Sequence, residues 1–117
     1  ITSTSTPLSS QPEIIVGTCT ELEKSYLRLT SAPKPELVRT EATLSKWFSI
    51  LSQKYAEETI NYSYLADQLK AIRQDLTVQR IENTLTVNVY EYHMHVSLQN
   101  SDMTEFNVCL QRLRGFD

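Results

Sequence analysis

The sequence predicts a helical domain over most of its 117 residues, and three observations carry that prediction. Residues 65–79 repeat apolar side chains at i, i+4, i+7 and i+11, which is one stripe of a helix. Two glycines and four prolines are few for this length, which favours helices with short connections. Capping-box spacings, in which an acidic residue follows a Ser, Thr or Asp three positions later, precede two of the apolar stripes.

The composition is that of one ordinary globular domain, with 40% hydrophobic and 21% charged residues. A net charge of −3 argues against a strong nucleic-acid binder standing alone, because phosphate binding normally needs a basic face. No apolar run reaches about eighteen residues, so no membrane span is predicted. The chain begins at Ile1 rather than Met and shows no secretory leader, and we expect it to be a fragment of something longer.

Residues 1–15 are predicted to be a flexible Ser/Thr-rich leader, and residues 16–117 the folded part. Residues 1–12 are uncharged and rich in Thr, Ser, Pro and Gln, so they bury too little apolar surface to order alone. We expect a tail that is disordered by itself or extended against a partner. Its end would be anchored on the core by Ile14, Ile15 and Val16.

A first helix is predicted over residues 20–29. Thr18 with Glu21, and Thr20 with Glu23, both have capping-box spacing. The inward stripe would consist of Leu22, Tyr26 and Leu29. The two prolines at 33 and 35 would end the helix, because proline cannot continue it.

A second helix is predicted over residues 40–58, with a start at Glu36 as the alternative. Its buried face is expected to hold Leu44, Trp47, Phe48, Leu51 and Tyr55. Asn61 or Ser63 would cap the third helix, which carries the stripe Leu65, Leu69, Ile72 and Leu76. Tyr62 and Tyr64, in its first turn, are expected to form the rim of the core.

Residues 84–98 fit a strand and a helix equally well on their own. β-branched and aromatic residues dominate the segment and alternate with polar ones, which favours a strand. The alternation slips by one between Val89 and Tyr90, so a single strand would need a bulge. A helix would instead carry two apolar stripes and pack on more than one side. Those stripes would be Leu85, Val89, Tyr92 and Val96, and Val87, Tyr90, Met94 and Leu98.

A last helix is predicted after Asp102, which forms an acidic first turn with Glu105. Gly115 is a natural C-cap, and two arginines suit the negative end of the helix. Its apolar stripe would be Phe106, Cys109, Leu110 and Leu113.

No catalytic, cofactor-binding or metal-ligating set is visible, and the sequence predicts no enzyme. His93 and His95 cannot share a metal on a helix and lack an evident third ligand, so solvated or rim histidines are expected. Cys19 and Cys109 match no metal-ligand spacing and are expected to be reduced thiols. With two glycines, no phosphate-binding loop is possible.

The basic residues on or beside the third helix are candidates for a surface that binds RNA or a partner. The candidates are Lys70, Arg73 and Arg80, but acidic residues alternate with them, which is typical of a solvated helix face. Arg73 could instead pair with Asp75 or with a carboxylate of a neighbouring helix.

Several blocks of the chain resemble the Sac-three/GANP family of nuclear scaffold proteins. They extend from about residue 15 to residue 113. The matching blocks are residues 17–19, 26–33, 69–79 and 87–91, followed by His93, residues 105–107 and Cys109. Within the family the chain looks most like the branch of the yeast Thp-three and human leukocyte-receptor-cluster member eight proteins.

The resemblance implies a fold and a role. It implies an all-α fold of antiparallel helix pairs, the N-terminal part of a TPR- or HEAT-like superhelix, with residues 84–98 helical. The family's winged-helix PCI module would be absent here. The implied function is a non-catalytic scaffold in the nucleus, in a complex that couples transcription elongation to mRNA processing, splicing and export.

The partners implied by the resemblance are a Csn-twelve-like PCI protein and a small acidic protein of the Sem/DSS type. RNA would be reached through the full-length chain, and no membrane or cofactor is expected. Two alternatives remain at this point. One is direct RNA binding through Lys70, Arg73, Arg80 and the rim tyrosines, and the other is a subunit of a proteasome-lid or signalosome assembly.

Overall fold

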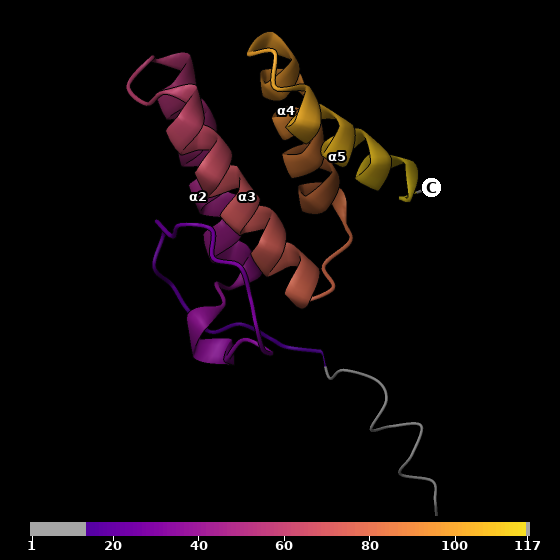
Figure 1. Ribbon diagram of the computed structural model, residues 1–117. Helices are drawn as coiled ribbons and strands as arrows, with labels where there is room; N and C mark the ends of the chain where they lie inside the picture. Colours follow the sequence, from indigo (N-terminus) through magenta and orange to yellow (C-terminus); the bar gives the residue numbers. More distant parts are fainter. Residues whose placement is uncertain (1–13, 117) are drawn as a thin grey trace, which may run out of the picture.

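Residues 14–116 fold into a stack of four α-helices preceded by an extended segment (Figure 1). The computed structural model describes residues 14–116. The elements, in chain order, are the 3₁₀ turn η1 (Pro35–Leu37), α2 (Glu41–Ala56), α3 (Tyr62–Val78), α4 (Thr84–Gln99) and α5 (Met103–Arg114). The described residues contain no strand, only one isolated bridge between Cys19 and Arg39, so the all-α prediction is confirmed.

Each helix packs on the one before it, which places α3 between α2 and α4. In Figure 1 α2 and α3 lie side by side, and α4 and α5 form a second pair. The core lies where the apolar stripes of α2, α3 and α4 meet, as predicted, and each fully buried Leu or Val stabilises the fold by about 1.5–3 kcal/mol. Its buried members are Leu44, Trp47, Leu51, Leu65, Leu69, Ile72, Leu76, Val89 and Val96.

Side-chain caps fix where the helices begin. Thr40 accepts from the Thr43 amide at α2. Asn61 accepts from the Tyr64 amide at α3, so Asn61 rather than the alternative Ser63 is the cap. Asn83 forms a capping box with Thr86 at α4, and Asp102 caps α5. The alternative start of the second helix at Glu36 is wrong, because η1 is a separate turn that ends before α2.

Residues 84–99 form helix α4, so the strand that local propensity suggested is not present. The helix is buried on more than one side, as its two stripes predict. Val89 and Val96 join the core, whereas Tyr90 packs edge-to-face on Phe116, beyond the end of α5. The packing of α4 between α3 and α5 outweighs the β-propensity of its residues.

The predicted helix over residues 20–29 is wrong. Residues 14–34, called the strap from here on, form no helix and cross the molecule as an extended chain (Figure 1). Leu22, Lys24 and Tyr26 are half-buried while the residues between them are exposed, which is the two-residue period of an extended chain. The apolar spacing of Leu22, Tyr26 and Leu29 therefore mimicked a helical stripe.

The predicted anchoring of the strap by apolar side chains is also wrong in part. Ile14 and Val16 are largely exposed, and Ile15 is half-buried. The predicted leader lies outside the described residues up to residue 13. Within residues 14–116, none of the helices is both long and apolar enough to cross a membrane.

Candidate functional site

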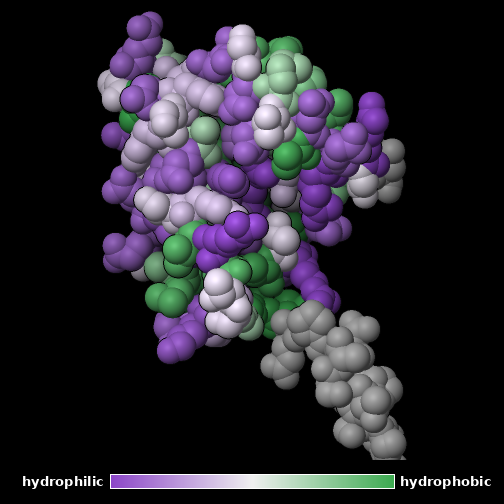
Figure 2. Space-filling model, in the orientation of Figure 1, coloured by the Kyte–Doolittle hydropathy of each residue, from purple (hydrophilic) through white to green (hydrophobic). Residues whose placement is uncertain are grey.

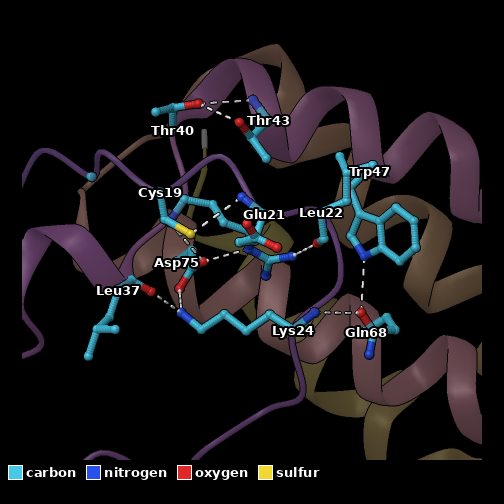
Figure 3. A network of polar contacts seen from close by, with 12 residues as sticks. Cys19, Glu21, Leu22, Lys24, Leu37, Thr40, Thr43, Trp47, Gln68 and Asp75 are labelled. Atoms are coloured by element: carbon cyan, nitrogen blue, oxygen red, sulfur yellow. Dashed lines mark hydrogen bonds and ion pairs between the residues drawn. The ribbon is translucent and has the colours of Figure 1, made fainter.

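One face of α3 holds the strap in place through polar side chains. Gln68, Asp75 and Gln79 stand at i, i+7 and i+11, so they line up along one side of the helix. All three are buried, with at most 9% of each residue exposed. Figure 3 shows Asp75 and Gln68 pointing toward the strap residues Cys19, Leu22 and Lys24.

Asp75 is the centre of this arrangement. Its Oδ2 accepts from Nε of Arg39 at 2.9 Å, and its Oδ1 accepts from Nζ of Lys24 at 2.9 Å. Arg39 is fully buried and also donates from Nη1 to the carbonyl of Leu22 at 2.6 Å. A buried carboxylate between two cations is stable only while both contacts persist, so Asp75 fixes the strap and the segment before α2 together.

Gln79 holds the start of the strap. Its Oε1 accepts from the Gly17 amide at 2.8 Å, and its Nε2 donates to the Arg39 carbonyl at 2.8 Å. Gly17 lies so close to the backbone just after η1 that a Cβ there would come within 2.3 Å of the Val38 carbonyl oxygen. Only glycine fits this approach without a shift of the backbone.

Three further α3 side chains bond to the strap backbone. Gln68 Oε1 accepts from the Lys24 amide at 3.2 Å and from the Trp47 indole N–H at 3.0 Å. Asp67 accepts from the Tyr26 amide at 3.4 Å, and Gln74 donates to the Leu27 carbonyl at 2.6 Å. Because these side chains satisfy main-chain groups that a helix would pair internally, the strap stays extended.

The opposite face of α3 is tied to α4 and α5 by Arg73. Its Nη1 donates to Glu105 of α5 at 2.7 Å and lies 3.1 Å from Nδ1 of His93 on α4. Its guanidinium also stacks over the Tyr90 ring, 5.1 Å from the centroid. Burial by itself would lower the pKa of Arg73, but the hydrogen bond to Glu105 and the surrounding groups raise it. Arg73 therefore stays charged and links three helices.

His93 and Cys109, beside the Arg73–Glu105 ion pair, are electrically neutral at physiological pH. Burial and the nearby Arg73 charge lower the pKa of His93 to about 4. Burial raises the pKa of the Cys109 thiol to about 11. The expectation of a solvated or rim histidine is wrong for His93, which is fully buried, and holds for His95, which is exposed. Both cysteines are free thiols, as predicted.

His93, Glu105 and Cys109 place one ligand atom each within 4.8 Å of one another, so a metal site has to be considered. Arg73 can only donate to Nδ1 of His93, which puts the ring proton on Nε2 and removes that lone pair. The same guanidinium already neutralises Glu105, and the thiol is protonated. The chemistry of this group is that of an internal ion pair rather than of a cation site.

Of the three predicted surface cations, Lys70 and Arg73 line one hollow, whereas Arg80 lines another. Arg73 is 9% exposed and paired internally with Glu105, which confirms the alternative of a carboxylate on a neighbouring helix. Lys70 is half-buried, lies 4.0 Å from Glu105 and stacks over the Tyr26 ring. Arg80 is exposed beyond the end of α3 with a positive φ of 56°.

The two tyrosines at the start of α3 form part of the rim of the core, as predicted. Tyr62 donates to Asp102 at 2.6 Å, and burial with this hydrogen bond raises its pKa to about 12. Tyr64 donates to Glu23 of the strap, and burial with that hydrogen bond raises its pKa to about 12. Both hydroxyl groups are therefore occupied in holding neighbouring segments.

The helices and contacts just described coincide with a known family domain. The sequence profile of the SAC3/GANP family matches residues 20–111, from the strap to the last turn of α5. The chain belongs to the SAC3/GANP family. Arg73, Asp75, His93 and Glu105 all lie within the matched range, so both sets of buried contacts are part of the SAC3/GANP domain.

Three SAC3/GANP relatives show how much of the longer proteins the chain covers. It is 50% identical to Protein THP3 of Saccharomyces cerevisiae over 85% of the chain and 21% of that protein. It is 50% identical to a THP3 homolog of Schizosaccharomyces pombe over 85% of the chain and 25% of that homolog. It is 41% identical to the Leukocyte receptor cluster member 8 homolog of Xenopus laevis over 86% of the chain and 12% of that homolog. The chain thus spans a quarter or less of each of these curated relatives.

Sequence reasoning missed the residues that hold the strap. Lys24, Arg39 and Gln79 are not singled out from the sequence, and Gly17 is included only in a block that resembles the family. One signal was present in the sequence of the third helix: Gln68, Asp75 and Gln79 form a polar stripe beside the apolar one. Such a stripe on a central helix indicates buried polar partners, but it does not say which segment supplies them.

Proposed function

We propose that this chain is the N-terminal helical part of a non-catalytic scaffold subunit in a nuclear complex. The complex couples transcription elongation to mRNA processing, splicing and export. The helices support a winged-helix PCI module that follows in the full-length protein and binds partner proteins and RNA. The proposed partners are a Csn-twelve-like PCI protein and a small acidic protein of the Sem/DSS type.

The observation that carries the proposal is the use of the family's polar residues. In the matched range, Asp75 holds the strap to α3, and Arg73 holds α4 and α5 to α3. Arg73 also lines a hollow of about 300 Å³ beside Tyr26, but its guanidinium is bound to Glu105. A set of buried ion pairs that fixes the relative positions of helices suits a rigid support. The similarity to THP3 proteins supports the choice of complex.

Affinity purification of the tagged full-length protein from nuclear extract tests the proposal. A Csn-twelve-like PCI protein and a small acidic protein should be recovered together, identified by mass spectrometry. Recovery of proteasome-lid or signalosome subunits in their place would favour the alternative assembly. Recovery of neither set would contradict the scaffold role.

Direct RNA binding by this chain is less well supported, because Arg73, one of the candidate cations, forms an ion pair with Glu105. A filter-binding assay at two salt concentrations separates the two functions. Scaffolding predicts little affinity of the isolated chain for RNA. An RNA-binding module predicts clear affinity that falls steeply with salt.

A further inference from the structure

Exposed apolar side chains gather on the strap and the turn that follows it. Of the eight large hydrophobic residues that are exposed among residues 14–116, five belong to this part of the chain. They form what we call the apolar patch: Ile14, Val16, Leu27, Leu29 and Leu37. Figure 2 shows hydrophobic side chains concentrated at the end of the molecule where the grey residues begin. Such a concentration is typical of an interaction surface.

Two hollows open within the apolar patch, next to each other. The first has a volume of about 680 Å³ and lies between Ile14–Val16 of the strap and Val78 at the end of α3. The second has a volume of about 430 Å³ and is lined by Leu27, Leu29 and Leu37. Ala32 and Pro33 line both, so the hollows are neighbours that one ligand chain could fill.

The rims of the hollows are basic. Lys24, Arg28 and Lys34 line the second hollow, and Arg80 lines the first. No Asp or Glu of the described residues lines either one. Lys24 is bound to Asp75, which leaves Arg28 and Lys34 as exposed cations beside apolar walls. This local charge is opposite in sign to the net charge of −3 of the whole chain.

We propose that the apolar patch binds an acidic linear segment of a partner protein. Its apolar side chains would fill the two hollows, and its carboxylates would lie over Arg28 and Lys34. This inference deepens the proposed scaffold function and rests on it, because it assigns one docking surface of the scaffold. An RNA strand fits less well, because neither hollow contains an aromatic ring on which a base could stack. A second copy of this chain also fits less well, because it would place two basic rims of like charge against each other.

Fluorescence anisotropy with a labelled peptide of the repeating sequence Asp-Leu-Glu-Phe tests the proposal. The chain should bind this probe and not a matched probe that carries Lys in place of Asp and Glu. Leu27→Asp should weaken binding by about tenfold or more, since it removes one apolar anchor and adds a repelling charge. Leu98→Asp is the matched control: Leu98 is 51% exposed on α4, away from the hollows, and its substitution should leave affinity unchanged.

A charge-reversal pair separates electrostatic from apolar recognition. Arg28→Glu with Lys34→Glu should weaken binding of the acidic probe by about tenfold or more. Lys46→Glu with Lys54→Glu, both exposed on α2, should change the affinity little. Circular dichroism verifies that every variant keeps the helix content of the wild type.

Several outcomes would overturn the inference. One is that the basic probe binds as tightly as the acidic probe. Another is that Leu27→Asp leaves the affinity for the acidic probe unchanged. A third is that a uridine-rich RNA binds more tightly than the acidic probe and depends in the same way on Arg28 and Lys34. Self-association that Leu27→Asp abolishes, seen by sedimentation velocity, would assign the patch to a second copy instead. If the probe fails while tagged full-length protein still recovers its PCI partner, the docking inference fails alone. If neither binds, the scaffold function fails as well.

Discussion

Two charged residues of α3, two positions apart, serve opposite sides of the helix. Asp75 binds Arg39 and Lys24 toward the strap, and Arg73 binds Glu105 toward α5. The sequence predicts that both lie in a helix with no catalytic role, and the buried contacts agree with a packing role. The partner of Asp75 could not be predicted, because Arg39 lies 36 residues away in a segment with no periodic signal.

Asp75→Asn should destabilise the fold by about 3 kcal/mol, because Arg39 would keep a buried charge without its counter-ion. The free energy of unfolding from urea titration measures the effect. Glu82→Gln is the control, since Glu82 pairs with Arg112 at a side-chain exposure of 58%. It should cost less than about 1 kcal/mol. Equal effects of the two substitutions would contradict the importance of the buried pair.

His93 should make stability fall in mild acid. Its pKa of about 4 in the fold lies below the 6.5 of an unfolded chain, so the unfolded state takes up a proton first as the pH falls. Between pH 6.5 and 4 this should remove about 3 kcal/mol of stability, whereas above pH 6.5 the contribution is constant. Urea titrations across this range measure it. His93→Gln, which can still accept from Arg73, should flatten the profile, and an unchanged slope would contradict the assignment.

Among the elements, those with several agreeing local signals were predicted well. Helix α3 has an uninterrupted apolar stripe and an Asn61 cap, and both appear in the fold. The strap was wrongly predicted as a helix, because Leu22 and Tyr26 at i and i+4 fit a helical stripe. Its backbone hydrogen bonds are instead made with α3 side chains far along the sequence. Helix α4 was ambiguous on its own residues, and the resemblance to a helical family decided it.

Asn83→Ala should destabilise the protein by about 1 kcal/mol, because helix α4 begins at this capping box and its residues favour a helix only weakly. Thermal unfolding followed by circular dichroism measures the change. Asn107→Ala, an exposed position inside α5, is the matched control and should leave stability unchanged or slightly raised. A larger loss at Asn107 than at Asn83 would contradict the role of the cap.

At the scale of the whole molecule, α3 is the central support. Its apolar stripe packs on α2 and α4, its polar stripe holds the strap, and Arg73 connects it to α5. The stacking order of the helices follows from short connections and could be predicted. The position of the strap and the apolar patch could not, because extended chain is placed by tertiary contacts rather than by its own period.

Hydrogen exchange of the wild-type chain and of Asp75→Asn, read by mass spectrometry, tests this central role of α3 most directly. The amides of Gly17, Lys24 and Tyr26 bond to α3 side chains and should exchange slowly in the wild type. In Asp75→Asn these amides should exchange much faster, while α5 keeps its protection. Fast exchange of the strap in the wild type, or equal loss of protection in the strap and α5, would contradict the account.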